Sequence, residues 1–87
     1  MADINKKQVL LNSLAKCTQE LRGEKSQFIL ASDYEISTSI ISTIERGLKD
    51  PQLTTVFKLA EALNIEPYKF VKRIQDNLPK DFTLIDK

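Results

Sequence analysis

Apolar residues recur at helical spacing along most of this chain, and that spacing limits the folds open to it. Leu10, Leu14, Cys17 and Leu21 follow one another by four, three and four positions, which places them on one face of a helix. Shorter apolar faces of the same kind follow within 38–46, 54–64 and 67–78, and no pair of segments alternates as paired strands do. The pattern predicts an all-α protein.

Residues that start or stop helices divide the chain into five helical segments. The expected starts after the first helix are Ser26, Ser37 and Thr54 as N-caps, and Pro67 in a first turn. Helix ends are expected at Gly23, Gly47, Asn64 and before Pro79. The predicted helices therefore cover about 6–21, a short segment from 27, 38–46, a segment from 54 to 64, and one from 67.

The size of the chain allows one small core. With 87 residues, 41% hydrophobic and 29% charged, it suits a compact five-helix domain, which we place at 1–78, followed by a tail at 79–87. The net charge of +1 neither requires nor excludes a nucleic-acid partner, because binding depends on a basic face and not on the total.

Several classes of site lack the residues they need. The chain has no His, and its one cysteine, Cys17, lies on an apolar stripe, so we expect no zinc site, disulfide or enzyme activity. No glycine-rich phosphate loop is present, and we expect no cofactor and no small-molecule ligand. The opening MADINKK lacks an apolar run, and no segment reaches the length of a membrane span. We therefore expect a cytoplasmic protein with no membrane partner.

Residues 26–47, SQFILASDYEISTSIISTIERG, predict two short helices joined by about four residues. This is the outline of a helix-turn-helix, in which the first helix braces the second against the major groove of DNA. Ala31 is small where the two helices would cross. The expected inward positions are Leu30, Ala31, Tyr34, Ile36, Ile41 and Ile44.

Across about residues 10–74 the sequence resembles the phage repressor and Cro type of helix-turn-helix protein. The shared pattern is SQ..LA, then IS...I..IERG, then P.L.T...LA.AL.I, which begins here at Ser26, Ile36 and Pro51 respectively. The resemblance implies a five-helix, lambda-repressor-like domain with its helix-turn-helix at helices 2 and 3. It further implies a homodimeric, sequence-specific regulator of transcription, with repression the expected action, that reads the major groove of double-stranded DNA with helix 3.

Four hydroxyl side chains would form the outward face of that third helix. Ser and Thr hydroxyls donate to or accept from several bases, and a Thr methyl can contact thymine. The candidate base contacts are Thr38, Ser39, Ser42 and Thr43. The plainer interpretation is that these hydroxyls only solubilise a surface helix, and the residues alone do not decide between the two.

Phosphate contacts would come from residues on either side of this helix. Lys25, Arg46 and Lys49 are cations at suitable positions, and the plainer alternative for each is a solvated surface charge. The resemblance adds Gln27 as a contact to the DNA backbone, in the first turn of helix 2. It also implies that Arg22 and Glu45 form a structural pair.

Three features left alternatives open. Glu35 stands where a glycine is usual in the turn, so either a non-glycine residue takes positive φ there or the turn differs. Ile29 and Ile40 occupy positions that are normally polar and outward, which also suits a protein-interaction or antitoxin-type module with weak DNA affinity. The tail carries Phe82, Leu84 and Ile85, which either cover the domain's own core or join two copies.

Overall fold

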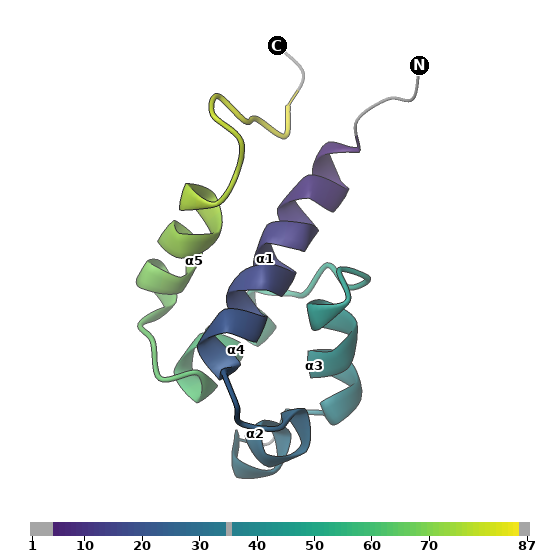
Figure 1. The fold of residues 1–87 in the computed structure, drawn as a ribbon, viewed down its shortest axis with the longest axis vertical. Coiled ribbons are helices and arrows are strands. Elements are labelled where there is room, and N and C mark those ends of the chain that lie inside the picture. The colour runs from purple at the N-terminus through teal and green to yellow at the C-terminus, as the bar shows by residue number, and fades with distance from the viewer. Residues whose placement is uncertain (1–4, 35, 86–87) are drawn as a thin grey trace.

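The chain folds into five helices, as the sequence predicts. The computed structural model describes residues 5–34 and 36–85, and in that part every regular element is an α-helix. The helices are α1 (Lys6–Arg22), α2 (Gln27–Tyr34), α3 (Thr38–Glu45), α4 (Leu53–Ala62) and α5 (Pro67–Asp76). The expected all-α, five-helix architecture is confirmed, and Figure 1 shows its arrangement.

Local signals account for most helix ends. The Ser26 hydroxyl accepts a hydrogen bond from the Ile29 backbone N–H at 3.0 Å, as expected of a cap for α2. Pro67 lies in the first turn of α5. Asn64 and Gly47 both take positive φ, at 61° and 71°, and so end α4 and α3 in the left-handed region.

One cap prediction is wrong, and a second is right in position but makes no capping bond. Thr54 is not a cap, because α4 begins one residue earlier at Leu53, after an extended Gln52 whose side chain makes no capping bond. Ser37 has the extended backbone of an N-cap, but its hydroxyl makes no capping bond. Both helices are held by their buried apolar faces and not by a hydroxyl cap. Glu35 lies outside the described residues.

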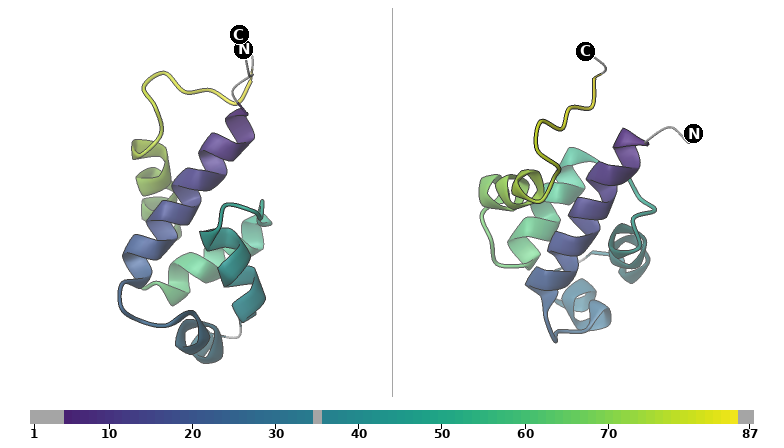
Figure 2. Two further views of the ribbon diagram at one scale, coloured as in Figure 1. Left: turned by 45° about the vertical axis from the view of Figure 1, so that its right-hand side comes forward. Right: turned by 45° about the horizontal axis from the view of Figure 1, so that its top comes forward.

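The long helix α1 organises the domain. It packs against α3 on one side and α5 on the other, while α2 packs against α3 and α4. Figure 1 shows α5 beside α1, α3 on the opposite side and α2 across the lower end, and the turned views in Figure 2 agree. This arrangement leaves the outer sides of α2 and α3 uncovered.

All five helices contribute to one core. Its fully buried large side chains are Cys17, Thr18, Leu30, Ile41, Ile44, Leu59 and Phe70. Burying each large apolar side chain contributes about 1.5 to 3 kcal/mol before the loss of chain entropy is counted. Ile40 is partly buried against this core, so the expectation that it points outward is wrong, whereas Ile29 is exposed as expected.

The residues after α5 turn back toward α1. Phe82 and Thr83 are half-buried, while Leu84 and Ile85 are exposed. Together with side chains of α1 and α5 they line an open apolar groove of about 500 Å³, whose walls include Leu10 and Val71.

Of the described helices, none has both the length and the apolar character to cross a membrane.

Candidate nucleic-acid interface

The outward side of α3 carries the four hydroxyl residues singled out in the sequence. Successive residues of a helix are rotated by about 100°, so Ser39, Ser42 and Thr43 lie opposite the buried Ile41 and Ile44, while Thr38, three residues before Ile41, lies at the edge of the outward side. Thr38 and Ser39 are exposed, while Ser42 and Thr43 are half-buried. The only acidic side chain of α3, Glu45, is buried on the other side. Within Thr38–Glu45 the outward face is therefore polar and uncharged, and the cation Arg46 follows directly at its end.

One of these hydroxyls is already engaged within the helix. The Thr43 hydroxyl donates to the backbone carbonyls of Ser39 and Ile40, both at 3.0 Å. Its single proton is therefore directed into α3. A base facing Thr43 would meet its methyl group or the acceptor lone pairs of its oxygen.

Arg22 and Glu45 form a bidentate ion pair between α1 and α3. Arg22 Nε donates to Glu45 Oε2 at 2.6 Å, and Arg22 Nη2 donates to Glu45 Oε1 at 2.7 Å. The Glu45 side chain is 4% exposed and that of Arg22 is 20% exposed. The hydrogen bond with Glu45 raises the pKa of Arg22 and outweighs the opposing effect of burial, so the guanidinium stays charged.

Gln27 joins this pair from the first turn of α2. Its side-chain Nε2 donates to Glu45 Oε1 at 3.0 Å, and the side chain is half-buried. Arg22 Nη1 also donates to the backbone carbonyl of Lys25 at 2.7 Å, which fixes the connection ahead of α2. One carboxylate thus links α1, α2 and α3, and the Gln27 amide takes part in the link.

The three candidate phosphate cations lie on both sides of the helix pair. Lys25 comes just before α2, Arg46 is the C-cap residue of α3, and Lys49 lies in the loop that follows. All three residues are exposed. By the rotation along the helix, Arg46 falls between Ser39 and Ser42, so its side chain emerges from the outward side of α3.

Two glutamines of α1 contact the end of α3, and no motif in the sequence pointed to these contacts. Gln19 Nε2 donates to the Glu45 carbonyl at 2.6 Å, and Gln8 Nε2 donates to the Gly47 carbonyl at 2.8 Å. Gln8 also donates to Asn12 Oδ1 at 2.8 Å. These bonds join residues 26 and 39 positions apart, so no local pattern predicts them.

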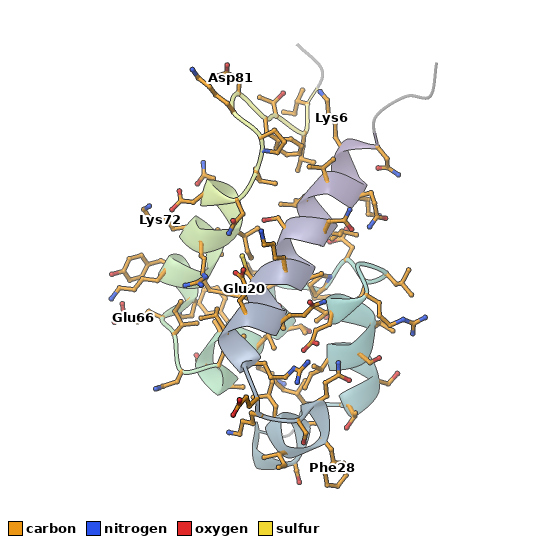
Figure 3. All side chains as sticks on the ribbon, in the orientation of Figure 1. Lys6, Glu20, Phe28, Glu66, Lys72 and Asp81 are labelled. Atoms are coloured by element: carbon orange, nitrogen blue, oxygen red, sulfur yellow. The ribbon has the colours of Figure 1, made fainter. Side chains whose placement is uncertain are left out.

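A small apolar surface lies beside this region on α2. Phe28 is 71% exposed and Ile29 is 48% exposed. Figure 3 shows the labelled Phe28 at the lower end of the molecule, pointing away from the domain.

Within 5–34 and 36–85, no three Cys, Asp or Glu side chains gather as a metal site requires.

Comparison with known proteins agrees with this geometry. A protein-family model described as helix-turn-helix matches residues 30–70, which run from the middle of α2 into α5. Comparisons with curated proteins and with solved structures each found no match.

Proposed function

We propose, from the match of residues 30–70 to a helix-turn-helix family model, that this chain is a DNA-binding regulator and a sequence-specific repressor of transcription. The matched residues include α3 and the end of α2, where the candidate interface lies. The proposal concerns how the chain binds DNA: α3 enters the major groove, and the residues beside it contact phosphates.

The observation that carries the proposal is the uncharged hydroxyl face of α3. A major groove about 12 Å wide admits an α-helix, and uncharged hydroxyl side chains can approach its base edges without repelling the phosphates. Thr38, Ser39 and Ser42 are side chains of this kind, and Thr43 adds a methyl group. Hydroxyls discriminate bases less sharply than bidentate Arg or Gln contacts, so DNA shape supplies part of the specificity.

Affinity comes mainly from the phosphates. Lys25 precedes α2 and Lys49 follows α3 in the chain, and Arg46 lies at the end of α3. Each cation that meets a phosphate releases counterions, which strengthens binding regardless of sequence. Gln27 contributes from the first turn of α2, where the helix dipole favours an anion, while its amide contacts Glu45.

The active species is a homodimer in the cytoplasm. One helix-turn-helix contacts one half-site, and two copies reach half-sites about 34 Å apart. The apolar residues of the tail, residues 82, 84 and 85, supply the contact between the copies. A dimer seated on its operator excludes other proteins from that DNA, and this is the basis for assigning repression.

A second candidate is a protein-interaction or antitoxin-type module with weak DNA affinity. The exposed Phe28 and Ile29 on α2 favour it, because a partner protein would bury them. Ile40 no longer supports it, since this side chain packs against the core. The uncharged α3 face and the three cations beside it favour DNA as the partner.

Selection from a random pool of duplex DNA tests the proposed function. The wild-type chain should enrich one motif made of two related halves, with centres about 10 base pairs apart or a multiple of that spacing. Recovery of unenriched sequences at every round would refute sequence-specific binding and leave the second candidate in place.

A further inference from the structure

The C-terminal end of α3 has all of its final carbonyls occupied. A helix cannot satisfy its last four carbonyls from within, so other donors must reach them. Here the donors are the backbone N–H groups of Arg46, Gly47 and Leu48, together with Gln19 Nε2 for the Glu45 carbonyl. Three of the four bonds come from the chain just beyond the helix, and the fourth comes from α1.

The carbonyl of Gly47, two residues beyond Glu45, is also held from α1. Gly47 takes φ 71° as the chain leaves the helix, and its carbonyl accepts from Gln8 at 2.8 Å. Asn12 accepts a second bond from the same Gln8 amide at 2.8 Å, which fixes the orientation of that amide. The two glutamines thus hold the backbone immediately before and shortly after Arg46.

We infer that Gln8 and Gln19 are positioning residues for DNA binding. They fix the backbone on both sides of Arg46, so this side chain leaves the end of α3 in the direction of a phosphate before DNA arrives. A contact that is already oriented loses less conformational freedom on binding, and the gain appears as affinity. The inference rests on the proposed function, because it requires that Arg46 contact DNA.

A double-mutant cycle tests the inference. Gln8→Met and Gln19→Met remove the amide while keeping a long side chain, and each is combined with Arg46→Ala. Each single variant should weaken binding to a generic duplex by about threefold or more. It should also make the slope of log affinity against log salt less steep, by up to about 0.9, so that it approaches the slope of Arg46→Ala. Neither substitution should weaken binding further once Arg46 is alanine.

Lys25→Ala provides the matched control, because it removes one charge at the other side of the interface. Gln8→Met and Gln19→Met should keep their full effects in that background. If a methionine variant does not fold, judged by its helical circular dichroism, the alanine variant at the same position replaces it, since alanine best preserves α1.

Two results overturn the inference in distinguishable ways. If wild type binds DNA but the glutamine effects are undiminished with Arg46→Ala, Gln8 and Gln19 only stabilise the fold. If wild type does not bind duplex DNA at all, the proposed function fails and the positioning role fails with it.

Discussion

Arg22 and Glu45 join the C-terminal ends of α1 and α3 through two charge-assisted hydrogen bonds of 2.6 and 2.7 Å. Glu45 is the last residue of α3, and its carboxylate is almost completely buried. Gln27 donates to the same carboxylate from α2. The pair therefore fixes the orientation of the proposed recognition helix relative to both of the helices that support it.

Arg22→Ala should lower the free energy of unfolding substantially. The substitution leaves the Glu45 carboxylate buried, with Gln27 as its one remaining side-chain partner among the described residues. We expect a loss of about 2 to 3 kcal/mol, below the full cost of breaking a buried pair because Arg22 is partly exposed. Urea unfolding of wild type and Arg22→Ala measures this difference in the free energy of unfolding.

Two further variants separate the charge from its geometry. Arg22→Lys should recover only part of the loss, because one ammonium cannot donate in parallel to both carboxylate oxygens. The double variant Arg22→Met, Glu45→Met should cost less than Arg22→Ala, since no charge remains buried. A loss below about 0.5 kcal/mol for Arg22→Ala, the range of a surface pair, would contradict this role.

Gly47→Ala should destabilise the domain by about 1 to 2 kcal/mol. An L-residue at φ 71° is strained, and a Cβ there would lie 2.7 Å from Asn12 Oδ1. Thermal unfolding of Gly47→Ala, alone and combined with Asn12→Ala, separates the backbone strain from the contact with the Asn12 side chain. The cost should be smaller without the Asn12 amide, and an unchanged cost would assign the whole effect to the backbone.

Much of this fold was predictable because its signals are local. Apolar spacing gives the buried faces, and Gly47, Asn64 and Pro67 end or begin helices through their own backbone preferences. Thr54 failed as a cap because α4 begins at Leu53 after an extended Gln52, and no side-chain capping bond marks that start. Ile40 was misplaced because burial at the edge of a helix face depends on the neighbouring helices.

The site was predictable to a lesser degree. The hydroxyl face of α3 follows from helical rotation alone. The contacts of Gln8 and Gln19 depend on how α1 crosses α3, which no local pattern encodes. The side-chain bond from Thr43 back into its own helix likewise became visible only in three dimensions.

The engaged hydroxyl of Thr43 leads to a prediction about sequence preference. If Thr43 contacts a base through its methyl group, Thr43→Val should keep the selected motif and Thr43→Ser should alter it, by about 1 kcal/mol or more at one position. Thr38→Ala and Ser39→Ala should each change the motif elsewhere. Selections run in parallel measure all four variants. The opposite result, in which Thr43→Val changes the selected motif and Thr43→Ser keeps it, would show that the Thr43 oxygen makes the contact.

The tail should contribute to dimerisation. Leu84 and Ile85 are exposed beside the apolar groove between α1 and α5, and burial in a second copy would remove them from water. Sedimentation should show a dimer for the whole chain at tens of micromolar and a monomer for a truncation ending at Asn77. Equal association of the two would assign the interface to another surface.

The central claim is that the face built on α3 binds double-stranded DNA, and a salt titration of the wild-type chain tests it most directly. Fluorescence anisotropy with a labelled generic duplex gives the affinity at each salt concentration. Binding should be saturable, and its log affinity should fall linearly with log salt, with a slope of about −0.9 for each phosphate contacted. Lys49→Ala should make that slope less steep by about the value for one phosphate contact. Absence of binding at about 50 mM salt, or an affinity independent of salt, would contradict the account.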